Sequence, residues 1–144
     1  MNLRPKILEL ETTHVFRISR SATARYRNVI AEVEHDGVIG IGEAAPSGFY
    51  GENAETVSSA LDQFAPLLGE DPFALEIVEE RLDRCLPGNY AAKAAVDMAL
   101  HDLIGKLSGQ PLYNDPFVGV RTEGGRTMLP DRPGLGVTKR EGGE

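Results

Sequence analysis

The sequence predicts an α+β fold, with a three-stranded antiparallel meander followed by a helical bundle. Over residues 6–13, 28–35 and 38–43, apolar and polar residues alternate with the period of β-strands. After residue 48, apolar residues recur three and four positions apart, which is typical of amphipathic helices. The 144 residues, 41% hydrophobic and 26% charged, suit one ordinary globular domain with a real core.

The meander is expected to contain three strands, over residues 6–13, 28–35 and 38–43. The second strand alternates most clearly, with Val29, Ala31 and Val33 on one face. Asp36-Gly37 follows it and is a strong signal for a tight hairpin turn. The third strand therefore returns antiparallel to the second.

Three helices are expected next, over residues 53–68, 71–86 and 89–107. Asn53 and Asn89 are candidate N-caps, and Asp71-Pro72 offers a cap followed by proline in the first turn. The third helix is rich in alanine, and such a face lets a helix approach its neighbour closely. Lys93 and Asp97 lie four residues apart in it and are expected to form an ion pair.

Charge, cysteine content and hydropathy argue against several classes of protein. The formal net charge is −7, and no basic stripe of the kind that binds nucleic acid is present. Cys85 is the single cysteine, so no internal disulfide forms, and it is expected to be a small buried apolar residue. No apolar run approaches the roughly 20 residues of a membrane helix, and no signal peptide is recognised. We expect a cytoplasmic protein that binds neither nucleic acid nor membrane.

Five segments, in this order and spacing, carry a resemblance to a known family. They are residues 14–20 (HVFRISR), 40–46 (GIGEAAP), 49–52 (FYGE), 91–102 (AAKAAVDMALHD) and 109–113 (GQPLY). With them, residues 1–113 resemble the N-terminal capping domain of the enolase superfamily, in its muconate-lactonizing subgroup. Within this subgroup the dipeptide epimerases are the most similar.

Residues 114–144 resemble a different part of the same enzymes, their extreme C-terminal segment. This similarity lies in residues 115–120 (DPFVGV) and 129–137 (LPDRPGLGV). In the family, this segment returns to the capping domain, so we expect it to pack there and its last residues to be disordered. Between the two parts the family has a (β/α) barrel, which is missing from this sequence.

The resemblance implies a magnesium-dependent 1,1-proton transfer on a dipeptide such as L-Ala-L-Glu. In the family, two barrel lysines act as acid and base and three barrel carboxylates bind Mg²⁺. We find no counterpart, so we expect no catalytic residue, no bound metal and no turnover by this chain. Asp97, His101 and Asp102 lie close along one expected helix, and a side facing solvent or another domain is favoured there over a metal site.

Three other interpretations stay open. The similar caps of o-succinylbenzoate synthase and muconate cycloisomerase differ from that of the epimerases mainly in their barrel partners. The chain could also be a non-catalytic, stand-alone binding domain, or a decayed product that barely folds. Without a barrel, the surface that normally meets it would be exposed and could lead to self-association.

Two loops would select the substrate in such a capping domain, over residues 19–27 and 47–52. The first is polar and aperiodic, and we expect it to be mobile. Arg20 is the first candidate to bind a substrate carboxylate and Arg25 the second, the alternative being solvated surface arginines. Phe49 and Tyr50 could form an apolar wall over the ligand or anchor their loop to the domain.

Overall fold

The computed structural model describes residues 1–18, 21–109, 117–118, 121–123, 126–128 and 138–139. At residues 16, 18 and 21–23, and after residue 109, it describes the backbone alone. The chain divides into two compact units, Met1–Leu112 and Tyr113–Glu144. The expected packing of the C-terminal segment on the first unit, and the expected disorder of its last residues, fall outside what is described.

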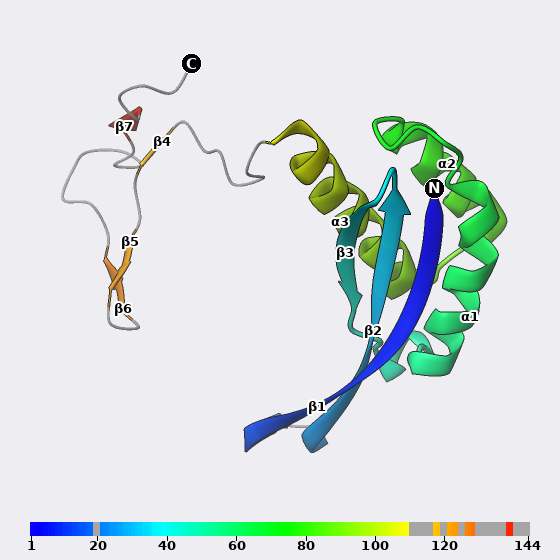
Figure 1. Cartoon of the computed structure of the whole chain (residues 1–144). Helices are drawn as coiled ribbons and strands as arrows, with labels where there is room; N and C mark the ends of the chain where they lie inside the picture. Colours follow the sequence, from blue (N-terminus) through cyan, green and yellow to red (C-terminus); the bar gives the residue numbers. More distant parts are fainter. Residues whose placement is uncertain (19–20, 110–116, 119–120, 124–125, 129–137, 140–144) are drawn as a thin grey trace. The chain divides into compact units, whose positions relative to one another are not determined.

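The first unit confirms the α+β prediction (Figure 1). Its sheet has the order β1-β2-β3 and is antiparallel throughout. The strands are β1 (Asn2–Ile18), β2 (Ser21–His35) and β3 (Val38–Ala44). The helices are α1 (Ala54–Phe64), α2 (Leu75–Cys85) and α3 (Tyr90–Ser108), with short 3-10 turns η1 (Gly48–Tyr50) and η2 (Ala65–Leu67).

The helices form two layers behind one face of the sheet (Figure 1). α3 lies against β2 and β3, α1 lies against β1 and β2, and α2 packs on the two other helices. No helix in the described part of the chain is long and apolar enough to cross a bilayer. The second unit contributes two short antiparallel pairs, β4 (Phe117–Val118) with β7 (Thr138–Lys139) and β5 (Arg121–Glu123) with β6 (Arg126–Met128).

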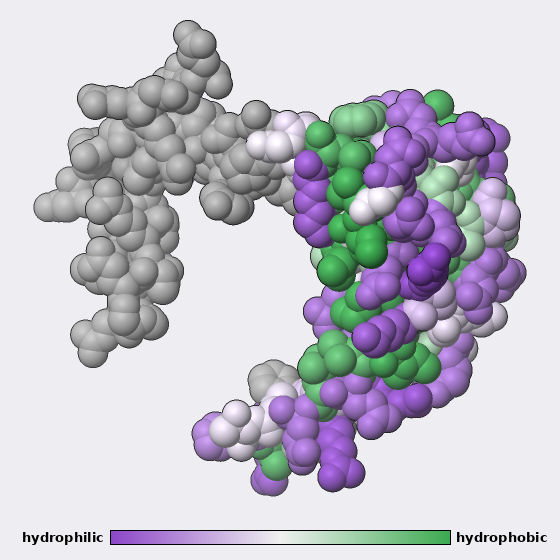
Figure 2. Space-filling model, in the orientation of Figure 1, coloured by the Kyte–Doolittle hydropathy of each residue, from purple (hydrophilic) through white to green (hydrophobic). Residues whose placement is uncertain are grey.

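The alternation predicted for β2 places one face of the strand in the core. Val29, Ala31 and Val33 are fully buried against the helices. The opposite face of the sheet is exposed to solvent. It includes the apolar side chains of Ile39 and Ile41, which are 44% and 49% exposed. Figure 2 shows hydrophobic patches interrupted by hydrophilic residues over the described surface.

The alanine-rich face of α3 packs directly on glycines of β3. A Cβ added to Gly40 would lie 2.1 Å from the carbonyl oxygen of Ala99, and one added to Gly42 would lie 1.9 Å from that of Ala95. No side chain fits at such distances, so helix and strand meet backbone to backbone. This confirms the close approach expected from the small residues. The largest fully buried side chains around this contact are Phe64, Leu61, Leu68, Leu100 and Leu103.

The start of α1 agrees with the sequence prediction, whereas the start of α2 does not. Asn53 Oδ1 accepts a hydrogen bond from the Thr56 amide at 2.9 Å, and Thr56 Oγ1 accepts one from the Asn53 amide. The expectation that α2 begins at Asp71-Pro72 is wrong, because the helix begins at Leu75. The Asp71 carboxylate instead accepts a hydrogen bond from the Phe73 amide at 2.9 Å, and this local turn competes with helix formation.

Two further expectations are corrected by the packing of α2 and α3. Cys85 is exposed, because α2 buries Val78 and Leu82 while Leu86 takes the next inward position. Asn89 does precede α3, but it adopts a left-handed conformation (φ 52°) and makes no side-chain cap. Its Nδ2 donates to the Pro87 carbonyl oxygen instead.

The polar segment 19–27 is not a loop over its described residues. Residues 21–27 belong to β2 and pair with β1, with Arg25 opposite Glu11 and Arg27 opposite Glu9. Residues 9–18 and 21–27 form a two-stranded arm that extends beyond the helices (Figure 1). Residues 21–27 lack hydrophobic alternation because no helix layer buries one face of the arm there.

Candidate functional site

The base of the arm is attached to α1 by Arg27, which the sequence analysis did not single out. Its Nη1 lies 2.5 Å from Glu55 Oε1, and its Nε lies 3.5 Å from Glu9 Oε1. The hydrogen bond between Arg27 and Glu55 lowers the pKa of that carboxyl and raises the pKa of the guanidinium. Glu55 lies in the first turn of α1, where the helix dipole also favours a negative charge. Arg27 is therefore engaged with the protein itself.

Arg25 lies on the arm with its side chain 84% exposed, and its Nε is 3.7 Å from Glu11 Oε1. Both members of this pair are exposed, so solvent screens their attraction. Arg25 also lines an open depression of the arm together with Glu9, Leu10, Glu11, Tyr26 and Arg27. Arg20, the first candidate of the sequence analysis, lies outside the described residues.

Phe49 and Tyr50 are presented to solvent by the 3-10 turn η1. The Ser47 hydroxyl accepts a hydrogen bond from the Phe49 amide at 3.3 Å, and Gly51 closes the turn in a left-handed conformation. Phe49 is 79% exposed and Tyr50 is 64% exposed, so neither ring is buried in the domain. Their centroids lie 5.1 Å apart in an edge-to-face arrangement. The turn thus exposes a large aromatic surface.

Tyr90 is a third aromatic residue beside this turn that sequence reasoning missed. Its ring centroid lies 6.0 Å from that of Tyr50, and it is also 64% exposed. The Glu52 carboxylate accepts a hydrogen bond from the Ala91 amide, which joins the turn to the start of α3. The sequence places Tyr90 directly after a predicted helix start, but it gives no sign of a contact with Tyr50, which lies forty positions earlier.

The polar side chains of α3 are engaged in contacts with neighbouring elements. Lys93 pairs with Asp83 of α2 at 2.6 Å, so the predicted pair with Asp97 is wrong. Lys93 is largely buried and points across to α2, whereas Asp97 Oδ1 lies 3.2 Å from His101 Nδ1. No three His, Cys, Asp or Glu side chains in the described residues converge in a way that could hold a metal ion.

Asp102 and Lys106 cover the free edge of β3. Asp102 Oδ2 accepts a hydrogen bond from the Ile41 amide at 2.8 Å, and Lys106 Nζ donates to the Ile39 carbonyl oxygen at 2.8 Å. The two side chains also pair with each other at 2.6 Å. Burial opposes ionisation of Asp102, but the hydrogen bonds from Lys106 and Ile41 outweigh it and lower the pKa. The pair satisfies edge groups that could otherwise pair with another strand.

A match to a known protein family covers most of the first unit and shows the family of the chain. Residues 5–114 match the family described as mandelate racemase / muconate lactonizing enzyme, N-terminal domain. The chain belongs to this family. The match includes the sheet, the three helices and the aromatic turn, so the capping-domain interpretation of the first part of the sequence is confirmed.

Relatives within the mandelate racemase / muconate lactonizing enzyme family include two kinds of isomerase. The chain is 42% identical over 105 residues to an L-Ala-D/L-Glu epimerase of Bacteroides thetaiotaomicron, a match that covers 73% of this chain and 27% of the relative. It is 37% identical over 102 residues to a chloromuconate cycloisomerase of a Pseudomonas species, covering 67% of this chain and 28% of the relative. The chain therefore matches little more than a quarter of the length of these relatives.

A solved structure from the same family shares the fold. It is a dipeptide epimerase of Enterococcus faecalis complexed with Mg and the dipeptide L-Leu-L-Tyr. The TM-score is 0.76 at 28% identity, with 81% of this chain and 35% of that chain covered. The first unit is thus similar in fold to part of an enzyme whose structure contains magnesium and a dipeptide.

Proposed function

We propose that the first unit, Met1–Leu112, is the substrate-specificity cap of a dipeptide epimerase-like isomerase. The observation that supports this most is the 42% identity to an L-Ala-D/L-Glu epimerase over 105 residues. The cap would close over a dipeptide such as L-Ala-L-Glu and exclude water from it. A cytoplasmic setting is part of the proposal and rests on the single cysteine of the sequence.

Each part of the proposed lid has a separate task. Phe49, Tyr50 and Tyr90 supply an exposed aromatic wall for the side chains of the dipeptide. Arg25 supplies a guanidinium for a carboxylate, and Arg20 is proposed for the same role from the sequence alone. Arg27 holds the base of the arm through Glu55.

We assign the proton transfer itself to the barrel of such enzymes, which has no counterpart in this sequence. Family chemistry needs a metal ion at the developing enediolate and two lysines as acid and base. The described carboxylates do not converge to hold Mg²⁺, and Lys93 and Lys106 are each paired within the domain. We therefore propose no catalytic step on these residues and no turnover by the 144-residue chain alone.

Exchange of the dipeptide α-proton in heavy water tests this absence of turnover. The purified chain is incubated with L-Ala-L-Glu and Mg²⁺, and exchange is followed by proton NMR. We expect the rate to equal that of the buffer control. Exchange that depends on both metal and protein would overturn this part of the proposal.

A chimeric enzyme tests the specificity role directly. Residues 1–112 replace the matching segment of the Bacteroides thetaiotaomicron epimerase, and turnover of L-Ala-L-Glu is measured. We expect kcat/KM within about tenfold of the parent enzyme, because the lid contacts suit the same substrate class. A folded chimera without dipeptide turnover would contradict the proposal.

Cycloisomerisation is the second candidate, because a chloromuconate cycloisomerase is 37% identical over 102 residues. The same segment is placed on the Pseudomonas enzyme and assayed with its own substrate. Activity in this chimera, together with none in the epimerase chimera, would favour the cycloisomerase interpretation.

A further inference from the structure

The arm formed by residues 9–18 and 21–27 has no packed apolar face to fix its direction. Its described side chains, over residues 9–17 and 24–27, are all exposed or half-buried. A two-stranded ribbon of this kind is at best marginally stable by itself. Contacts at the base of the arm therefore have a large influence on where it points.

Arg27 joins the base of the arm to the start of α1. Its guanidinium lies between two carboxylates, with Nη1 2.5 Å from Glu55 Oε1 and Nε 3.5 Å from Glu9 Oε1. Glu55 lies in the first turn of α1, and the core fixes this turn because Ala54 and Val57 are buried. The ion pair of Arg27 and Glu55 thus ties the arm to a part of the domain that cannot easily move.

The first turn of α1 also holds the aromatic turn, residues 48–51, in place. Only Glu52 and Asn53 lie between the two. The Glu52 amide donates to the Ser47 carbonyl oxygen at 3.1 Å, its carboxylate accepts from the Ala91 amide, and Asn53 caps α1. Figure 1 shows that α1 starts at the end of the sheet from which the arm extends. One helix turn is therefore the common support of the arm and the aromatic turn.

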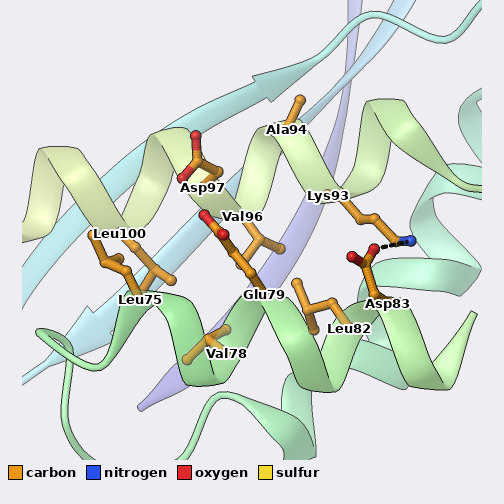
Figure 3. A pocket seen from close by; sticks show the side chains of 10 residues that line it. All are labelled: Leu75, Val78, Glu79, Leu82, Asp83, Lys93, Ala94, Val96, Asp97 and Leu100. Carbon is orange, nitrogen blue, oxygen red and sulfur yellow. Dashed lines mark hydrogen bonds and ion pairs between the residues drawn. The ribbon is translucent and has the colours of Figure 1, made fainter.

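Another ion pair between elements shows why the pair at Arg27 has a larger effect on geometry. Lys93 of α3 and Asp83 of α2 also join two elements, at 2.6 Å (Figure 3). Apolar packing already fixes the separation of these helices, because three side chains beside the pair are at most 2% exposed, namely Val78, Leu82 and Val96. The arm lacks such packing, so its direction depends more strongly on its ion pair.

We propose that Glu55 is a positioning residue that acts through Arg27 and sets the distance between the arm and the aromatic turn. This inference rests on the proposed function, which places both segments over one dipeptide. Arg25 on the arm would meet a carboxylate, and Phe49 on the turn would meet a side chain. A dipeptide must then match the distance between the two segments, and small displacements are costly in such a site. Glu55 selects the length of the substrate without touching it.

Distances between spin labels test this proposal in the full 144-residue chain. The labels are attached at Thr13→Cys on the arm and Gly48→Cys on the turn, in a Cys85→Ser background, and measured by pulsed electron paramagnetic resonance. Thr13 is exposed, and nothing lies within 4 Å of a Cβ added to Gly48. We expect Glu55→Gln to widen the distance distribution about twofold, because the arm then pivots about its base. Arg27→Gln should have the same effect.

Glu80→Gln is the matched control for Glu55→Gln. The Glu80 carboxylate also lies 2.5 Å from an arginine, Arg84, but both residues belong to α2. The control removes the same charge and the same kind of ion pair, and it should leave the distance distribution unchanged. A distribution that stays narrow in Glu55→Gln, or that widens equally in Glu80→Gln, would overturn the proposal.

The epimerase chimera gives a second readout, which a merely structural role would not change. In it, Glu55→Gln should raise KM for L-Ala-L-Glu about threefold and keep kcat within about twofold, since it weakens binding and leaves the chemistry intact. Glu80→Gln should change neither constant. A fall in kcat at unchanged KM would contradict the positioning role. A chimera without turnover would contradict the proposed function, whereas the spin-label distances would still decide whether Glu55 positions the arm.

Discussion

Gly42 determines how closely α3 approaches the sheet. At this position the carbonyl oxygen of Ala95 occupies the space that a Cβ would need. Gly40 faces the next turn of α3 in the same way, against Ala99. Glycine is required here because the backbones of helix and strand are in contact, and neither glycine has the positive φ found in turns.

We expect Gly42→Ala to destabilise the chain by about 3 kcal/mol or more, because strand and helix must separate to admit the methyl group. Urea denaturation followed by circular dichroism measures the change. Gly48→Ala is the matched control, since nothing lies within 4 Å of its added Cβ, and its effect should stay within about 0.5 kcal/mol. Similar midpoints for the two variants would show that α3 shifts without cost.

The edge contact of Asp102 makes stability depend on pH. Because its pKa is lowered in the fold, the stabilisation is present above the unfolded pKa of about 3.9 and is lost as pH falls through the folded value. We expect Asp102→Asn to cost about 1 kcal/mol at pH 7, since an amide oxygen can still accept from Ile41 but the charge is lost.

Denaturation at several pH values checks this expectation. The difference between wild type and Asp102→Asn should shrink as pH falls from 6 to about 3. Asp62→Asn, on an exposed part of α1, controls for a general change of net charge. A difference that stays constant over this range would mean that the ionised form contributes nothing.

The helix starts show how far local sequence governs an element. At α1, Asn53 and Thr56 form a reciprocal cap that the residue types alone predict. At α2, equally suitable residues form a turn at Asp71, and the helix starts later. Asn89 takes a left-handed conformation at the tight connection after Pro87-Gly88. Asp and Asn side chains can also form local turns that compete with capping. An Asp or Asn before a helical pattern therefore indicates that a helix starts nearby more reliably than it identifies the capping residue.

We expect Asn53→Ala to destabilise the chain by about 1 kcal/mol, because the Thr56 amide at the start of α1 loses its acceptor, the Asn53 side chain. Asn89→Gly should change the free energy of unfolding by about 0.3 kcal/mol, because glycine tolerates φ 52° and no cap is lost. Urea denaturation of both variants compares them. A larger loss of stability in Asn89→Gly than in Asn53→Ala would mean that Asn89 caps α3, although it makes no capping hydrogen bond in the structure.

At the scale of the whole molecule, the buried apolar residues of the described part lie between Leu3 and Leu103. The described core of sheet and helices therefore lies within the first unit. We expect a chain of residues 1–112 to unfold cooperatively in urea, with a free energy of unfolding within about 1 kcal/mol of the full chain. Loss of cooperativity would mean that residues 113–144 complete the core, as their resemblance to a returning segment implies.

The candidate site was only partly accessible from the sequence. Phe49 and Tyr50 could be singled out because their segment resembles a substrate-selecting loop of the family, and both are exposed. Tyr90 could not, because it joins them only through the packing of α3 beside η1. The segment 19–27 was misinterpreted because a strand without a helix layer has no hydrophobic period to reveal it.

The sequence by itself determined the order of strands and helices, the alternation of β2 and the small-residue face of α3, because periodicity and residue size act over a few neighbouring positions. The tertiary structure decided which charges meet. Lys93 pairs with Asp83, Arg27 with Glu55, and Asp102 with the Ile41 amide, across separations of ten to sixty-one residues. Such pairs depend on where whole elements are placed, and an ion pair is too weak to place them itself. Burial of the apolar core places the helices and strands, and the charged side chains then pair with the partners that lie within reach.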